Sequence, residues 1–168
     1  MNDEPRSWKS NALELVAVLA RWWLGGLFLY MGLNKALHPV DFLKLVREYD
    51  LVQSPFWLNS IAAALPWFEV FCGVLLVAGV AVRGSALMLL MMLVPFTVVV
   101  LQRALALHAT QGIPFCAVKF DCGCGGGEVL ICRKLVENAV LVLLSAWLLT
   151  GRGHRLCACY RLLKSEIE

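Results

Sequence analysis

The chain has 168 residues, of which 60% are hydrophobic and only 16% are charged, whereas about a quarter of the residues of a soluble domain carry a charge. With a mean hydropathy of +0.74, the apolar side chains are too many for one core, and some of them must face lipid. The net charge of +3 is too small for a nucleic-acid-binding protein, and seven cysteines are too few for a disulfide-stapled secreted module. The composition therefore predicts one integral membrane domain.

Four apolar runs follow one another along the chain, at residues 12–33, 61–82, 85–107 and 135–150. Crossing the hydrocarbon layer as a helix takes about 20 mostly apolar residues. The runs lack the alternation of barrel strands, and a backbone exposed to lipid must satisfy its own hydrogen bonds, so each run predicts a membrane-spanning helix. The predicted fold is all-α: an antiparallel four-helix bundle in a single membrane domain over residues 1–168.

The connections between the predicted spans differ in length. Arg83 and Gly84 form the centre of a tight turn between the second and third spans, so the other two connections, which are long, must share one membrane face. Within the first long connection, residues 39–49 carry apolar side chains at helical spacing opposite charged ones, which predicts an interfacial helix on the membrane surface. Its apolar members are Phe42, Leu45, Val46 and Tyr49.

The second long connection, residues 108–134, holds four of the seven cysteines: Cys116, Cys122, Cys124 and Cys132. A disulfide between Cys122 and Cys124 would close a very small ring, and strained disulfides suit exchange better than stapling. If the last helix begins near Glu128, its dipole would also lower the pKa of these thiols. The pattern predicts a redox pair, with Cys116 and Cys132 as resolving or structural cysteines.

Other interpretations of these cysteines stay open. Cys122 and Cys124 could be inert thiols, or could form a static bridge to Cys116 or Cys132. All four could bind zinc, but paired zinc ligands usually have about two to four residues between them, and this pair has only Gly123. Redox chemistry is therefore preferred, and no metal site is predicted.

The remaining cysteines lie outside this connection. Cys72 falls within the second span and is expected to be a small buried apolar residue. Cys157 and Cys159 follow the last span, on the face opposite to Cys122 and Cys124, where a cytoplasmic location would keep them reduced. The alternative is that they exchange electrons across the membrane with the outer pair.

Polar residues inside the spans form a second candidate site, because a charge in hydrocarbon must face the bundle interior and find a partner. Counting from the predicted helix ends places Arg21 and Glu69 at depths that differ by about 6 Å, so the two are expected to pair. The pair would either lock two helices together or relay protons. Further members of a polar vestibule beneath the cysteine connection are Asn34, Lys35, Gln102, Arg103, Glu137 and Asn138.

Several motifs carry a resemblance to a known family. They are Arg21-Trp-Trp-Leu-Gly25 and Gly32-Leu-Asn-Lys35 in the first span, Leu65-Pro66-Trp-Phe-Glu69 in the second, and Cys122-Gly-Cys124 before the last. Together they resemble the DoxX-like membrane proteins, in particular the MauE (methylamine utilisation) branch, from about Arg21 to Leu149. Where that branch typically reads Cys-Gly-Cys-Phe-Gly, this chain has Gly125 in place of the aromatic residue.

The resemblance implies a four-helix protein of the bacterial cytoplasmic membrane that works with a thioredoxin-like partner in extracytoplasmic disulfide formation. Lys and Arg divide almost evenly between the two faces, but the basic run after Thr150 favours cytoplasmic termini. The predicted function is therefore thiol–disulfide oxidoreductase chemistry through Cys122 and Cys124 on the extracytoplasmic side. No cofactor is identified from the residues, and a quinone follows only by analogy with DoxX-like relatives.

A non-catalytic function is the alternative. The chain could be an accessory subunit whose helices pack against a larger membrane complex, because small residues in apolar spans let helices approach closely. The glycines that favour this interpretation are Gly25, Gly26, Gly73 and Gly79. The predicted partners are thus membrane lipid and either a thioredoxin-like extracytoplasmic protein or a larger complex.

Overall fold

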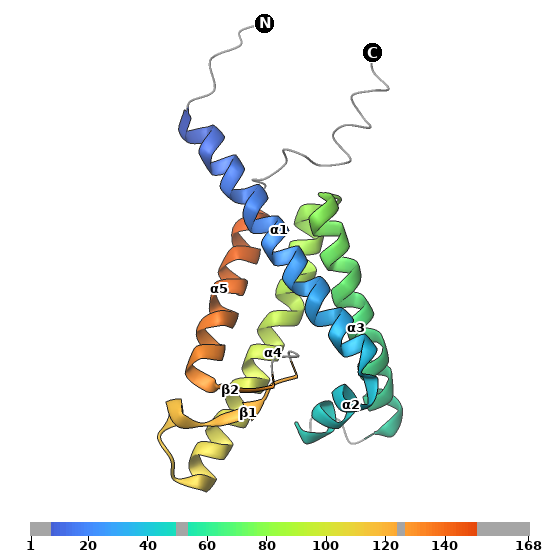
Figure 1. Cartoon of the computed structure of the whole chain (residues 1–168), viewed down its shortest axis with the longest axis vertical. Helices are drawn as coiled ribbons and strands as arrows, with labels where there is room; N and C mark the ends of the chain where they lie inside the picture. Colours follow the sequence, from blue (N-terminus) through green and yellow to red (C-terminus); the bar gives the residue numbers. More distant parts are fainter. Residues whose placement is uncertain (1–7, 50–53, 124–126, 151–168) are drawn as a thin grey trace, which may run out of the picture.

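The computed structural model describes residues 8–49, 54–123 and 127–150. Four long helices, α1 (Trp8–Leu37), α3 (Pro55–Ala78), α4 (Val82–Gln111) and α5 (Ile131–Leu149), run along the length of the molecule (Figure 1). A short helix α2 (Pro39–Glu48), a 3₁₀ turn η1 (Phe115–Ala117) and the strands β1 (Lys119–Asp121) and β2 (Glu128–Leu130) lie together at one end. The two long connections therefore share one end of the molecule, as predicted.

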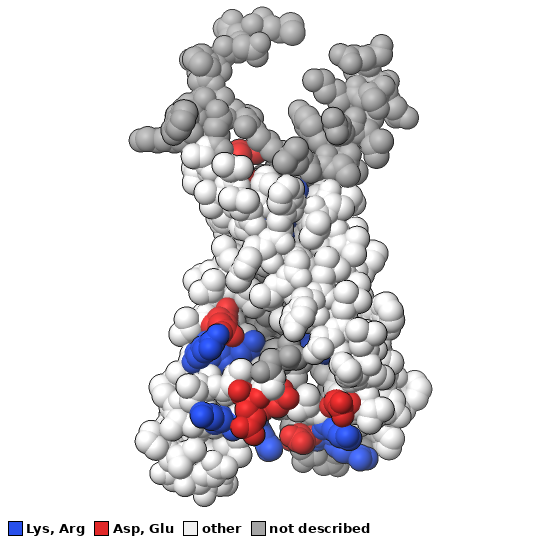
Figure 2. Space-filling view, viewed as in Figure 1, with Lys and Arg blue, Asp and Glu red and all other residues white. Residues whose placement is uncertain are grey.

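Among the described residues, three helices are long and apolar enough to cross a membrane: Ala12–Leu37, Pro55–Ala78 and Val82–Gln111. The first two turns of α5 carry Arg133, Lys134 and Glu137, and this helix of 19 residues leaves no apolar stretch of spanning length clear of these charges. Figure 2 shows the charged side chains of one face gathered toward the end that holds α2 and the strands, below a broad uncharged band. A mostly helical membrane protein is thus confirmed with three candidate spans, and the fourth span stays a prediction.

The turn between α3 and α4 comes earlier than expected. Gly79 ends α3 with a φ of 73°, a left-handed conformation that glycine adopts at no steric cost. Because α4 already begins at Val82, Arg83 and Gly84 lie in its first turn and not at the centre of the connection. The predicted span boundaries therefore differ from the observed helix ends by several residues.

Glycines bring α1 and α3 into close contact. A Cβ atom added to Gly25 would lie 2.9 Å from the carbonyl oxygen of Gly73, and one added to Gly73 would lie 2.8 Å from the carbonyl oxygen of Gly25. Gly32 lies in the same way against Pro66, with 2.8 Å between the added Cβ and the carbonyl oxygen. Such small residues allow helix backbones to approach closely in a membrane. Gly25 and Gly73 are thus used within the chain, whereas Gly26 has open space around it.

We expect Gly25→Ala to destabilise the protein and Gly26→Ala to leave it unaffected or slightly more stable. At Gly25 the new methyl group would push α1 away from α3, and overpacking of this kind costs about 1–3 kcal/mol. At Gly26 nothing lies within 4 Å of the new methyl group. The measurement is the midpoint of thermal unfolding of the full chain in detergent. Equal midpoints for the two variants would contradict the close contact.

The strands β1 and β2 form an antiparallel hairpin that was not predicted, in which Phe120 pairs with Val129 and Asp121 with Glu128. Glu128 therefore belongs to a strand, and α5 begins at Ile131, so the proposed helix dipole near Glu128 is not present there. A signal existed in the sequence, because a glycine-rich segment flanked by β-branched and aromatic residues is typical of a hairpin.

Two apolar clusters make up the interior. The first joins α1, α3, α4 and α5 in the half of the molecule that holds the start of α1, with Leu24, Leu76, Leu89 and Leu148 among its members. The second joins α4, β1 and the start of α5, with Val100, Val118, Cys122 and Ile131 among its members. The segment that carries Cys122 is thus part of the packed interior and not an external loop.

Candidate functional site

A disulfide holds the cysteine-rich segment in place. It joins Cys116 in η1 to Cys132 in the first turn of α5, with 5.0 Å between the two Cα atoms. The backbone N–H of Ile131 also donates a hydrogen bond to the carbonyl of Val118, 3.1 Å away. Because Cys116 and Cys132 are bonded to each other, neither supplies the static bridge to Cys122 or a thiolate for the four-cysteine zinc site that the sequence left open.

Cys122 directly follows β1, where the hairpin turn begins, and is only 3% exposed. Gly123 comes next with a φ of 77°, and its N–H donates to the Oδ1 atom of Asp121, 2.8 Å away. A Cβ atom added to Gly123 would lie 3.6 Å from Leu45 of α2. The helix α2 therefore packs directly onto this turn. Cys124 lies outside the described residues, as do Cys157 and Cys159.

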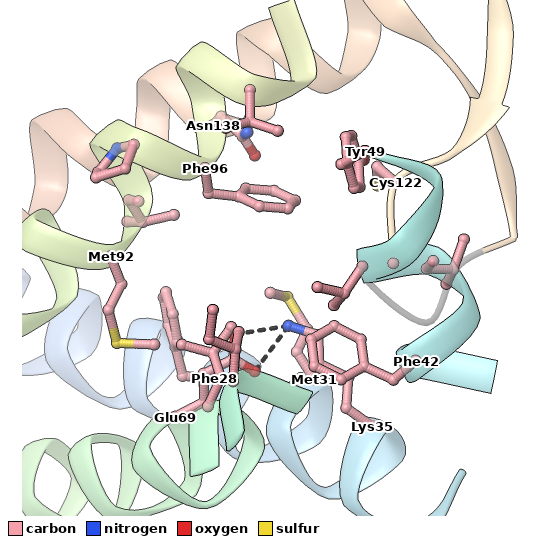
Figure 3. A pocket seen from close by; sticks show the side chains of 18 of the residues that line it. Phe28, Met31, Lys35, Phe42, Tyr49, Glu69, Met92, Phe96, Cys122 and Asn138 are labelled. Carbon is pink, nitrogen blue, oxygen red and sulfur yellow. Dashed lines mark hydrogen bonds and ion pairs between the residues drawn. The ribbon is translucent and has the colours of Figure 1, made fainter. Parts of the chain in front are cut away.

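A cavity of about 370 Å³ lies next to Cys122, between α1, α2, α3, α4 and α5 (Figure 3). Its walls are mostly apolar and include Phe28, Phe96 and three methionines, Met31, Met91 and Met92. A helix is present where residues 39–49 predicted one, but its apolar side chains line this cavity. These side chains, which are Phe42, Leu45, Val46 and Tyr49, thus face the protein interior, whereas the sequence placed them against lipid.

An ion pair lies at one wall of the cavity. The Nζ atom of Lys35 on α1 is 2.6 Å and 2.8 Å from the two carboxylate oxygens of Glu69 on α3. Both side chains are buried, and the ring of Phe42 from α2 lies over the ammonium group, with its centroid 5.3 Å from Nζ. An aromatic ring in this position attracts a cation. Three elements thus converge on the Lys35–Glu69 pair.

The sequence predicted that Glu69 pairs with Arg21, and this prediction is wrong: Glu69 pairs with Lys35. Gly32 lies beside Glu69 in the contact between α1 and α3, and Arg21 is eleven residues nearer the N-terminus, roughly 16 Å along the helix axis. The error arose because depths were counted from the helix ends as if these ends lay at one level. The contacts of Gly25 with Gly73 and of Gly32 with Pro66 set the shift of α1 along α3 instead. Arg21 is fully buried in the other half of the molecule.

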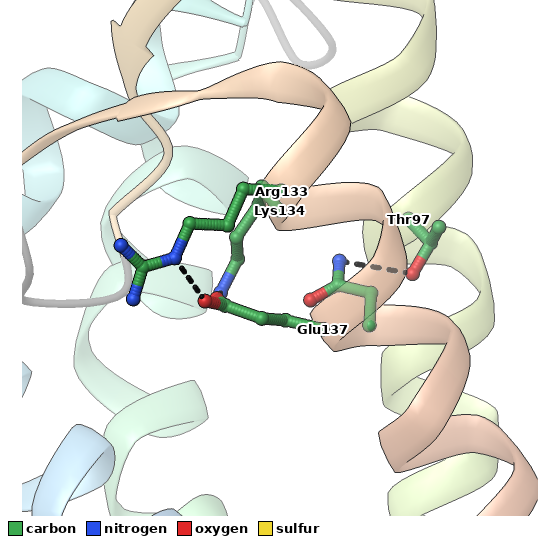
Figure 4. A network of polar contacts seen from close by, with 5 residues as sticks. Thr97, Arg133, Lys134 and Glu137 are labelled. Carbon is green, nitrogen blue, oxygen red and sulfur yellow. Dashed lines mark hydrogen bonds and ion pairs between the residues drawn. The ribbon is translucent and has the colours of Figure 1, made fainter.

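Asn138 of α5 lies across the cavity from the ion pair (Figure 3). Its Nδ2 atom donates a hydrogen bond to the hydroxyl of Thr97 on α4, 3.1 Å away (Figure 4). The Thr97 hydroxyl in turn donates to the carbonyl of Leu93. The sequence analysis did not identify Thr97, although a hydroxyl group in an apolar run was a signal for it. This hydrogen bond connects α4 and α5 at the cavity wall.

The other predicted polar residues do not join this group. Glu137 pairs with Arg133 at 2.9 Å and lies 3.8 Å from Lys134 (Figure 4), and it does not line the cavity. Arg103 is partly exposed on α4 and does not line the cavity. Of the polar residues predicted within the spans, the cavity brings together Lys35, Glu69 and Asn138.

A smaller polar pocket of about 200 Å³ adjoins the apolar cavity, and four residues border both: Lys35, Phe42, Leu45 and Gly123. Its other lining residues include Asn34, His38, Asp41 and Asp121. Asn34 and Lys35 belonged to the vestibule predicted beneath the cysteine segment. The turn at Gly123 therefore separates a polar pocket from an apolar cavity.

Comparison with protein families gives a match over most of the chain. The model of a family described as methylamine utilisation protein MauE matches residues 13–151. This region contains the cavity, the ion pair and the hairpin with its disulfide. No curated protein and no solved structure is significantly similar to the chain.

Proposed function

Because the chain belongs to the family of methylamine utilisation protein MauE, we propose that it supports thiol–disulfide exchange at the outer face of a bacterial cytoplasmic membrane. Cys122 and Cys124 are the exchanging pair in this proposal, one as the attacking thiolate and the other as the resolving thiol. The partner is a thioredoxin-like extracytoplasmic protein. The helix α5 serves as the fourth span of a single four-helix domain.

The observation that carries this proposal is the Cys116–Cys132 disulfide beside Cys122. Structural disulfides persist in oxidising compartments and are rare in the cytoplasm. We therefore assign the end with α2 and the hairpin to the outside of the cell. The start of α1 and the end of α5 lie at the other end (Figure 1), which supports cytoplasmic termini.

The exchange requires only thiols and disulfides. A thiolate of the reduced client attacks the Cys122–Cys124 disulfide, whose S–S bond breaks as a mixed disulfide forms. The second client thiol then displaces the cysteine of this chain, so the client gains a disulfide while Cys122 and Cys124 take up two electrons and two protons. An electron acceptor must afterwards reoxidise the pair.

We expect Cys122→Ser to reduce the oxidation of a thioredoxin-like dithiol to the uncatalysed rate, because no disulfide can form at this position. Cys72→Ala, which changes a cysteine buried in α3, should exchange like the unmodified chain. The measurement is differential alkylation with mass spectrometry on native membranes: free thiols are blocked, disulfides are reduced mildly, and the released thiols are labelled with a second reagent.

Exchange at the unmodified rate in Cys122→Ser would overturn the proposal. An unreactive cysteine pair in a chain that copurifies stoichiometrically with a larger membrane complex would instead favour the accessory subunit. Gly26 is available to such a partner because no atom lies within 4 Å of a Cβ added there. Gly25 and Gly73 are already used in the contact between α1 and α3.

A further inference from the structure

The apolar cavity has the size and the access of a site for a lipophilic ligand. Its volume of about 370 Å³ falls in the range of roughly 300–1,000 Å³ that is common for small-molecule sites. Met91 belongs to its wall and is 68% exposed, so the cavity reaches the outer surface of α4. Since α4 is a candidate membrane span, a ligand can enter from the lipid.

Two opposite walls of the cavity each offer a hydrogen-bond donor (Figure 3). The Lys35 ammonium group has three N–H bonds, and contacts with the Glu69 oxygens account for two of them. The Asn138 amide has two N–H bonds, and Thr97 accepts one. Within the described part of the chain, one N–H therefore stays available on each side for a ligand that has two separated acceptor oxygens.

Cys122 provides the third element of the site. Its side chain lies in the cavity wall, is 3% exposed, and is adjacent to Gly123, onto which α2 packs. A folded protein cannot approach the sulfur through the cavity, whereas a small lipophilic molecule within it can. The reactant that meets Cys122 on this side must therefore be small and membrane-soluble.

We propose that the cavity binds the ring of a membrane-soluble quinone, held by Lys35 and Asn138, as the electron acceptor for the Cys122–Cys124 pair. This inference rests on the proposed function. The two carbonyl oxygens of a quinone lie on opposite sides of its ring, as do the two donors. The S–H bonds of Cys122 and Cys124 break, one S–S bond forms, and the two electrons and two protons pass to the carbonyl oxygens, which leaves a hydroquinone.

Binding is tested apart from the redox step, in a full-length chain that carries Cys122→Ser and Cys124→Ser. Decylubiquinone is titrated into this protein in detergent, and the Kd is measured by calorimetry. Val99 lines the cavity, whereas its neighbour Val98 does not and is 47% exposed. Val99→Phe should weaken binding at least tenfold and Val98→Phe should not change it. Asn138→Leu should weaken it by up to about tenfold, the effect of one lost hydrogen bond.

1-Decanol, which has the tail without the ring, separates a quinone site from a site for acyl chains. Quinone binding that is lost in Val99→Phe, kept in Val98→Phe and not matched by 1-decanol supports the proposal. Equal affinities for the two ligands, or an equal quinone Kd in the two phenylalanine variants at unchanged unfolding midpoints, would overturn it.

The two proposals fail in different ways. If quinone binds as described but the unmodified chain exchanges no thiols, the proposed function is lost and the site remains. If the chain exchanges thiols but binds no quinone, the proposed function remains and this inference is lost.

Discussion

Lys35→Met is expected to cost about 3–5 kcal/mol of folding free energy, the usual loss when one member of a buried ion pair is removed. The variant would leave the carboxylate of Glu69 without its partner in an environment where the side chain is 7% exposed. Because the pair connects α1 and α3 and is covered by Phe42 of α2, the loss should also loosen α2. The measurement is the unfolding midpoint of the full chain in detergent.

A second variant separates the charge from the packing. The double substitution of Lys35→Met with Glu69→Gln removes both charges, and a buried pair replaced by neutral groups of similar volume often loses little stability. The double variant should therefore be more stable than Lys35→Met alone. If the double variant were less stable than Lys35→Met, the unpaired charge of Glu69 would not be the cause of the lost stability.

A matched control exists on α2. Lys44 pairs with Asp41 at 3.1 Å, but the side chain of Lys44 is 69% exposed and that of Asp41 is 70% exposed. Exposed pairs contribute under about 1 kcal/mol, so Lys44→Met should change the midpoint little. If Lys44→Met lowered the unfolding midpoint as much as Lys35→Met, burial of the ion pair would not be the cause of the lost stability.

Removal of the Cys116–Cys132 disulfide by serine at both positions is expected to cost about 3 kcal/mol, since the bridge closes a loop with a sequence separation of 16. The loss of stability should be concentrated in β1, β2 and the turn at Gly123. These elements are otherwise held by a short ladder, by the hydrogen bond from Ile131 to Val118, and by packing against α2 and the second apolar cluster.

Two measurements check this expectation. Hydrogen exchange at Phe120 and Val129 should accelerate, and after mild reduction Cys122 should react faster with an alkylating reagent than in the unmodified chain. Cys72→Ala is the control, because this cysteine lies in the core of the other half of the molecule. Unchanged hydrogen exchange in the hairpin would mean that the ladder and the packing around it hold the segment without the disulfide.

Single residues show where prediction from the sequence succeeded. The helix over residues 39–49 followed from the spacing of Phe42, Leu45 and Val46, which depends only on neighbours within the same helix. The surface against which these residues pack could not be inferred, since an apolar face suits lipid and a protein cavity equally well. Gly25 and Gly73 were predicted to let the helices of a larger complex approach, whereas the structure uses them in the contact between α1 and α3 of the same chain.

The sequence by itself determined that this is a helical membrane protein, where its apolar helices run and that its two long connections meet at one end. These properties depend on the length and polarity of local runs. Only the tertiary structure decided that Glu69 pairs with Lys35, that Cys116 joins Cys132 and that a cavity opens beside Cys122. Such partnerships depend on the register between segments far apart in the chain, which contacts such as that of Gly25 with Gly73 set and no local run determines.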